Sequence, residues 1–167
     1  GISGLRFELS SILSEAIALN PPGAREAGRL WCRLGRHFGQ DDGDYSRGEG
    51  AFRHALSIAH DHSDIALEMQ TLVESGWVSG YHNKWQESLQ SIRRAIELAP
   101  LLDAPYIESP ARFWAALGSL AEGDLDGARR HASTMHAVAE RLRSDHWQGN
   151  ALWRLEMVSS LEGNWQA

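Results

Sequence analysis

The sequence predicts an all-α protein built from antiparallel helix pairs, because it combines a repeat, a helical apolar pattern and recurring turns. Residues 83–100 carry apolar side chains at the spacing of one helix face, and Pro100 ends the segment. The pattern recurs at a fixed step, which places bulky residues in one evenly spaced column: Tyr45, Trp85, Leu125 and Trp165. Turn-forming pairs precede three of them, at 43–44, 123–124 and 163–164. A step of this length is typical of stacked helical repeats, so we expect an α-solenoid of about four repeats.

The repeat divides the chain into helices in a fixed order. Residues 5–17 form an amphipathic helix that ends at the breaker 20–23, which makes it the second helix of an incomplete repeat. The first helices of the following repeats are expected at about 24–40, about 63–81, up to about 122, and about 145–162. Second helices begin at 45, 85 and 125, and Asn83 is expected to cap the second of these. Residues 1–167 are therefore expected to form a single helical domain, excised from a longer protein, with a partial repeat at each end.

The segment 100–110 fits the repeat least well. By the period, Asp103 should cap the first helix of the third repeat, and Pro105 should lie in its first turn, where a missing N–H does no harm. Pro110 would then lie inside the helix and kink it. The alternative is an extended loop that reaches Ser109. The period favours the kinked helix.

Composition limits the classes of function. The net charge of −6 argues against a nucleic-acid-binding surface. No apolar run approaches the length that spans a membrane, and no secretion signal is visible. Cys32 is the one cysteine, so the chain forms no internal disulfide, which fits a reducing cytoplasmic setting, and we expect it to be a small buried residue.

Small and large residues also keep the step of the repeat and predict how the helices pack. Small residues on the first helices should let their partners approach closely: Gly39, Ser79, Ser119 and Ser159, together with Gly76 and Ala116. Large residues on the second helices should fill the space between pairs: Tyr45, Phe52, Trp85 and Ile92. We therefore expect the Trp85 ring to be buried and to contribute strongly to stability.

Several motifs resemble tetratricopeptide repeats over essentially the whole chain. They are Trp31-x-x-Leu34-Gly35, Gly43-Asp44-Tyr45 and Phe52-x-x-Ala55, then Gly76, Trp85, Ile92, Ala95 and Pro100, then Gly123-Asp124-Leu125-x-x-Ala128. The period of 40 exceeds the usual ~34 and is similar to the long repeats of MalT-like, LuxR-type bacterial regulators and of ATPase- or cyclase-linked signalling proteins. The resemblance implies a right-handed superhelical arm beside an ATPase and an output domain. Met135 in place of a small residue, and Gly48 and Ser88 in place of alanine, depart from the pattern.

In that family the first helices line the concave face, which implies a binding stripe. Stepping along the chain by one full repeat gives Arg33, His37, Asp41, Val73, Trp77, Tyr81, Phe113, Leu117, Ala121, Trp153, Met157 and Leu161. From the second repeat onward this stripe is apolar and partly aromatic, which suits a groove for an apolar peptide or helix. A small molecule stacked on the rings is one alternative. The other is that the rings pack between neighbouring first helices and bind nothing.

Other polar clusters carry weaker hypotheses. His60, His62 and Asp64 resemble a metal site but lack a further ligand at fixed spacing, so we expect a solvated loop. Arginines at helical spacing form a basic face that should meet solvent or the acidic turn, with an acidic partner or phosphate as the alternative: Arg25, Arg29, Arg33 and Arg36. No set of activated groups and no glycine-rich phosphate loop is present, so we expect no enzyme, no metal and no cofactor.

The sequence thus predicts a protein-interaction or autoregulatory module of a larger bacterial cytoplasmic signalling or transcription-regulatory protein. Its partner would be a protein or peptide, including other domains of the same parent chain, with no nucleic acid and no membrane. A small-molecule sensor that binds an inducer in the groove is the alternative. Apolar faces at the two ends should favour fraying or end-to-end association: Leu5, Leu9 and Ile12, and Leu152, Leu155 and Val158.

Overall fold

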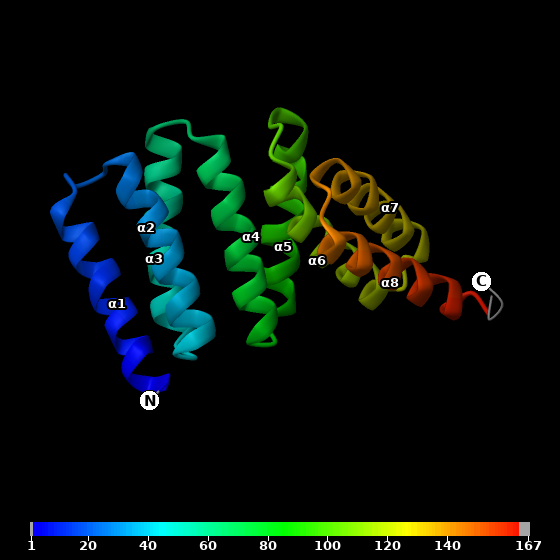
Figure 1. Ribbon diagram of the computed structural model, residues 1–167, viewed down its shortest axis with the longest axis horizontal. Helices are drawn as coiled ribbons and strands as arrows, with labels where there is room; N and C mark the ends of the chain where they lie inside the picture. The colour runs from blue at the N-terminus through cyan, green and yellow to red at the C-terminus, as the bar shows by residue number, and fades with distance from the viewer. Residues whose placement is uncertain (1, 164–167) are drawn as a thin grey trace. The chain divides into compact units, whose positions relative to one another are not determined.

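The protein is all-α, and the computed structural model describes residues 2–163, with side chains from residue 8 onward (Figure 1). The α-helices are α1 (Ile2–Leu19), α2 (Arg25–Arg36), α3 (Tyr45–Asp61), α4 (Ile65–Tyr81), α5 (Trp85–Leu98), α6 (Pro105–Glu122), α7 (Leu125–Leu142) and α8 (Asp145–Leu161). A π-helical segment, His37–Asp41, continues α2, and a 3-10 turn, Ala99–Leu101, follows α5. The chain divides into two units, 1–102 with α1–α5 and 103–167 with α6–α8. Within each unit, successive helices pack as antiparallel neighbours.

The helix starts confirm the predicted period. The first helices of the pairs, α2, α4, α6 and α8, begin at positions 25, 65, 105 and 145, and the second helices, α3, α5 and α7, begin at 45, 85 and 125. The joints between helices recur at half this period, and each is marked by a residue with left-handed φ: Gly23, Gly43, Ser63, Asn83, Gly123, Arg143 and Gly163. Position 103 alone breaks this series within the described chain, and it is where the two units divide.

Helix caps lie one residue later than the sequence predicts. Asp44, Asp64 and Asp124 accept hydrogen bonds from the backbone N–H three residues ahead, and Ser144 does the same for α8. Asn83 does not cap α5, so that prediction is wrong. It has φ of 59°, a left-handed conformation that asparagine tolerates but that a capping residue does not take.

From Pro105 onward the proline-rich segment is helical, which confirms the helix reading and excludes the extended loop to Ser109, whereas residues 102–104 are not helical. The α6 helix begins at Pro105 and continues through Pro110 to Glu122. Asp103 does not cap it, because the capping position falls on Ala104. The Asp103 carboxylate instead accepts a 2.7 Å hydrogen bond from Arg141 of α7, which ties this joint to the neighbouring helix.

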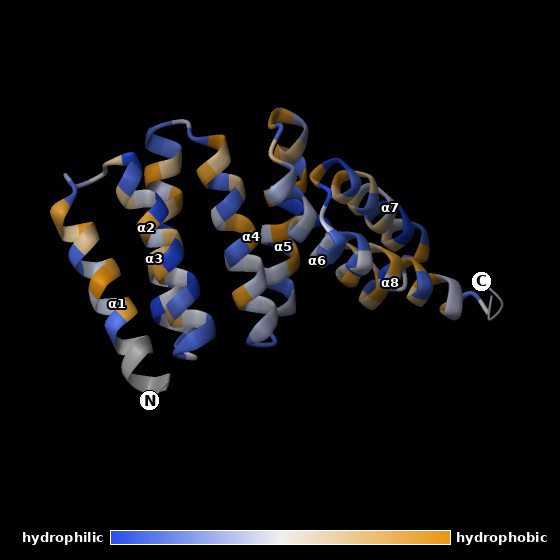
Figure 2. Ribbon diagram, in the orientation of Figure 1, coloured by the Kyte–Doolittle hydropathy of each residue, from blue (hydrophilic) through white to orange (hydrophobic). Residues whose placement is uncertain are grey.

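Small residues set the spacing of the helix pairs, which confirms the prediction at Gly76, and Gly35 does the same although it was not among the predicted small residues. A Cβ atom added to Gly35 would lie 2.8 Å from the Phe52 ring, and one added to Gly76 would lie 2.8 Å from Ile92. Phe52 and Ile92 are buried against these glycines. A side chain at either glycine would force Phe52 or Ile92, or the partner helix that carries it, to shift. Figure 2 shows apolar and hydrophilic residues interspersed along the helices. From α2 to α8, each helix combines buried with exposed residues.

The prediction that the Trp85 ring is buried is wrong, since 48% of the side chain is exposed. Tyr45, its counterpart one repeat earlier, is partly covered by α4 of the same unit. The Tyr45 hydroxyl lies 3.3 Å from Ser79 Oγ, and its ring packs 5.3 Å from that of His82. Trp85 opens α5, the last α-helix of the first unit, so no further helix pair of that unit covers it.

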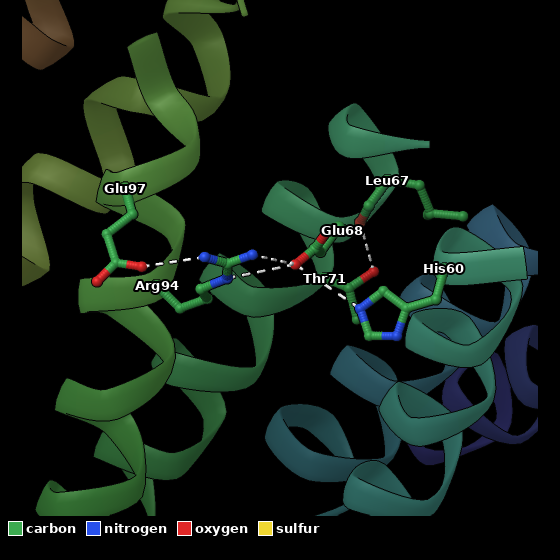
Figure 3. A network of polar contacts seen from close by, with 6 residues as sticks. All are labelled: His60, Leu67, Glu68, Thr71, Arg94 and Glu97. Carbon is green, nitrogen blue, oxygen red and sulfur yellow. Dashed lines mark hydrogen bonds and ion pairs between the residues drawn. The ribbon is translucent and has the colours of Figure 1, made fainter. Parts of the chain in front are cut away.

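A polar network ties α3, α4 and α5 together (Figure 3). The Glu68 carboxylate lies between Arg94 of α5, at 3.5 Å, and His60 of α3, at 3.7 Å. Arg94 also pairs with Glu97 of its own helix at 3.1 Å. The partly buried Glu68 therefore links α3, α4 and α5. This contact lies at the end of α3, where His60 and His62 resemble part of a metal site in the sequence.

Candidate functional site

The first unit holds a pocket of about 370 Å³ between α1, the α2 helix with its π-helical end, and α4. It is lined by Leu9, Leu13, Cys32, Arg33, Arg36, His37, Asp41, Gln70 and Glu74. The pocket thus joins an apolar wall from α1 to charged groups from α2 and α4. Its volume lies in the range of ~300–1,000 Å³ usual for small-molecule sites.

An ion pair between α2 and α4 forms one side of this pocket. Arg36 Nη1 lies 3.2 Å from Glu74 Oε1. The other carboxylate oxygen, Oε2, is buried, and no group among the described residues donates a hydrogen bond to it. Burial raises the pKa of Glu74, and the neighbouring Arg36 offsets only part of this shift. Glu74 therefore lines the pocket with a desolvated carboxylate, one oxygen of which has no donor among the described residues.

The π-helical segment brings a histidine and an aspartate to the same pocket. His37 is buried, and its Nδ1 lies 2.8 Å from Asp41 Oδ2. A π-helical turn inserts one residue into the helix and often occurs at functional sites. Here it allows the last turn to carry Asp41 to the pocket wall, and the segment then ends in the acidic turn before α3.

Arg33 and Gln70 complete the polar lining. In the range 8–163, neither side chain has a hydrogen-bond or ion-pair partner. Arg33 is exposed and Gln70 partly buried, one turn before Glu74 on the same face of α4. Cys32 is buried, as predicted, and burial raises the pKa of its thiol to about 12, so the thiol stays protonated and unreactive.

The second unit buries an arginine between aromatic rings. Arg154 of α8 is 3% exposed, and its guanidinium lies 4.2 Å from the Phe113 ring centre and 4.3 Å from that of Trp153. Its Nη1 donates to Met157 Sδ at 3.3 Å, whereas no described side chain accepts from Nε and no described carboxylate pairs with the group. Desolvation lowers the pKa of Arg154, but a guanidinium stays charged at neutral pH. Among the residues that the structure describes, this cation is buried and has no counter-charge.

An open depression of about 320 Å³ lies beside this arginine on α8. It is lined by Trp153, Glu156, Met157, Ser160 and Leu161. Trp153 and Leu161 are 52% and 63% exposed, which is unusual for such large apolar side chains. The surface is therefore open and largely apolar, carries the Glu156 carboxylate, and lies next to a buried positive charge.

The structure divides the predicted stripe between buried and exposed positions. Val73 is only 3% exposed and His37 is buried, so these two side chains form part of the packed interior. Trp77 is partly buried beneath Arg36, whose guanidinium lies 5.1 Å from the ring centre, while Tyr81 is exposed. In the second unit, Phe113, Leu117 and Met157 are partly buried, and Trp153, Leu161 and Ala121 are exposed.

The predicted stripe included Arg33, His37 and Asp41, which the structure brings together in the first-unit pocket, but it missed Glu74 there and Arg154 on α8. Glu74 and Arg154 each follow a stripe residue directly and lie two repeats apart in the same column. The other two positions of that column are the apolar residues Leu34 and Trp114. The charged residues at positions 74 and 154 therefore depart from an apolar column, and the sequence alone could have revealed this. The predicted basic face is also corrected in part, since Arg25 pairs with Asp64 at 3.3 Å and Arg36 with Glu74, both at α4.

The histidines at the end of α3 bind protein groups. His62 Nε2 lies 2.8 Å from the Gly23 carbonyl oxygen, and His60 contacts Glu68. In the part of the chain that the structure describes, no three metal-binding side chains cluster, and no helix is long and apolar enough to cross a bilayer. In comparisons with known proteins, neither a protein-family model nor a curated protein matches this chain.

Proposed function

We propose that this chain is a protein-interaction module that binds a peptide segment on the surface formed by α6 and α8. In this proposal the helix pairs belong to a right-handed superhelical array of the tetratricopeptide type. The regular spacing of the helix starts supports this reading. So do the glycine-mediated contacts between paired helices.

The observation that carries the proposal is the buried guanidinium of Arg154. A buried charge is costly unless it is paired, and stacking on Phe113 and Trp153 returns only part of that cost. A carboxylate from a partner would supply the missing counter-charge. The neighbouring depression, with Trp153 and Leu161 exposed, would accept aliphatic side chains of the same partner. The partner is therefore an acidic peptide segment with apolar residues beside the acid.

The biological setting follows from the resemblance in the sequence. The module would act in a larger bacterial cytoplasmic regulator, and the peptide would come from another protein or from another domain of the same parent. Binding would then hold the parent in one state, and release would free it. The proposal assigns the chain no catalytic step, cofactor or nucleic-acid contact.

The test is selection from a random peptide library, followed by affinity measurement with the selected peptide and its Glu-to-Gln version. We expect an acidic residue beside aliphatic ones, and binding at least about tenfold weaker for the Gln version. Arg154→Met keeps an apolar stack and should abolish the preference for acid, while Trp153→Ala should weaken both peptides. Leu152→Ala, at an exposed leucine on the same helix, is the matched control. Equal affinity for both peptides in the parent chain would overturn the role of Arg154.

A second candidate function is small-molecule sensing. The polar pocket of the first unit favours it, because several charged groups converge there beside an apolar wall. This pocket is formed by α1, α2 and α4 alone and is separate from the peptide surface.

A further inference from the structure

We propose that the pocket of the first unit binds a small zwitterion with an apolar body, the chemistry of a free aliphatic amino acid. The inference goes beyond peptide binding on α6 and α8. It rests on three polar groups without a partner among the described residues, namely the Arg33 guanidinium, the Gln70 amide and the Oε2 atom of Glu74, and on the apolar wall from α1.

Glu74 supplies the site for the ammonium group. Arg36 occupies only Oε1, at 3.2 Å, and leaves Oε2 as a buried acceptor with no donor among the described residues. A hydrogen bond from a cationic donor stabilises a buried carboxylate oxygen more than an exposed carboxylate oxygen, because water does not compete for the buried atom. An ammonium group has three N–H donors and could donate one of them to Oε2, the oxygen that Arg36 leaves unmatched.

Arg33 supplies the site for the carboxylate group. It lines the same pocket from α2, and within the described side chains its guanidinium is not engaged by any acid. A guanidinium binds a carboxylate through two parallel N–H donors, which fixes orientation as well as charge. Across the whole lining, the two arginines, Arg33 and Arg36, balance the formal charges of the two acids, Asp41 and Glu74. A ligand with one positive and one negative end is therefore favoured over a simple cation or anion.

The remaining lining selects the rest of the ligand. Leu9 and Leu13 of α1 form an apolar wall, in which Leu13 is buried and Leu9 is exposed. An aliphatic side chain placed against them would lose contact with water. Gln70 carries both a donor and an acceptor one turn before Glu74, so it can bind either polar end. The pocket volume of about 370 Å³ admits a single amino acid or a short peptide.

The experiment compares leucine with analogues that each lack one charged group, by calorimetry on the whole chain. Isoamylamine lacks the carboxylate and isocaproate lacks the ammonium group. We expect leucine to bind at least about tenfold more tightly than either analogue, since each loses one charge-assisted contact. Leucyl-leucine keeps both termini but lengthens the body, so tighter binding of the dipeptide than of leucine would identify a peptide as the source of the zwitterion.

Variants assign the two ends. Glu74→Gln should remove the advantage of leucine over isocaproate, and Arg33→Gln should remove its advantage over isoamylamine. Arg29→Gln, at an exposed arginine of the same helix outside the pocket, is the control and should bind like the parent. Circular dichroism and the urea midpoint verify that each variant folds. Equal binding of leucine and both analogues, or no binding of any of them by the folded chain, would overturn the inference. Peptide binding on α8 is unaffected by these variants, so failure here leaves the proposed function intact.

Discussion

The Ser88 hydroxyl donates a 2.7 Å hydrogen bond to the Gly76 carbonyl oxygen, directly across the contact between α4 and α5. Both residues are buried, and the glycine has space for no Cβ because Ile92 of α5 occupies it. The sequence suggested Ser88 as a departure from the alanine usual at its position. The structure shows that the Ser88 hydroxyl donates an interhelical hydrogen bond to the Gly76 carbonyl oxygen, which the absence of a side chain on Gly76 brings close.

We predict that Gly76→Ala destabilises the first unit more than Ser88→Ala does. The added Cβ would lie 2.8 Å from Ile92 and 3.2 Å from the Ser88 carbonyl oxygen, and such overpacking costs about 1–3 kcal/mol. Ser88→Ala removes one hydrogen bond at about 1 kcal/mol. Urea midpoints measure both, with Gly50→Ala as a control at an open helical position that should be stabilised by about 0.5–1 kcal/mol. A larger loss in Ser88→Ala than in Gly76→Ala would contradict this order.

Trp85→Ala should cost little stability, contrary to the expectation from its place in the repeat. Its side chain is 48% exposed, so truncation removes only part of a buried contact, at about 1 kcal/mol or less. Phe52→Ala, at a 3% exposed ring of the preceding helix pair, should cost about 3–5 kcal/mol. Chemical denaturation of both variants checks the contrast. Equal large losses would show that Trp85 is covered in solution.

Arg143→Gly should stabilise the second unit by about 0.5–1 kcal/mol. Arg143 has φ of 51°, a left-handed conformation that costs an L-residue about 1–2 kcal/mol and glycine almost nothing. Part of this gain is offset because glycine increases the conformational entropy of the unfolded chain. Its counterpart in the preceding joint is Gly123, with φ of 77°. Gly123→Ala is therefore the reverse experiment and should destabilise. Thermal melting of the pair tests the sign, and a destabilised Arg143→Gly would mean that the arginine side chain makes a contact that outweighs the backbone strain.

The second unit should lose stability as the pH falls below about 6.5. His131 lies on α7, and its Nδ1 accepts a hydrogen bond from Arg112 Nη1 of α6 at 3.2 Å. Burial, then the charges of Arg112 and Arg130, lower the pKa of His131, against a small opposing effect of Asp124. Because the folded pKa lies below the unfolded one, the unfolded chain binds more protons in acid. The stabilisation is complete above pH 6.5 and is lost as the pH falls through the folded pKa.

His131→Gln tests this pH dependence, since glutamine can still accept from Arg112 but does not titrate. As the pH falls from 7.5 to about 5, we expect the parent to lose more stability than the variant. His136→Gln on the same helix is the control, because this histidine is partly exposed and faces Glu140. If the urea midpoint of the parent falls no more steeply with decreasing pH than that of His131→Gln, the proposed role of His131 is wrong.

The repeat, the helices and their approximate ends could be read from the sequence alone. These features depend on local chemistry, namely the spacing of apolar residues, the prolines and the glycines at the joints. The same local information placed the caps at Asn83 and Asp103, one residue too early. At Asn83 the left-handed residue and the cap position are neighbours with similar side-chain preferences, and only the backbone conformation separates them.

The candidate sites depended on which residues lie opposite one another. The sequence identified the stripe, but not that Val73 is buried, that Arg36 pairs with Glu74, or that Trp85 is open. It also contained no sign that Arg154 lies between Phe113 and Trp153, because these rings come from two helices and only their packing brings both onto one guanidinium. Sequence periodicity determines which face of a helix a residue occupies. The burial and pairing of that residue are decided by the neighbouring helix, which only the tertiary structure specifies.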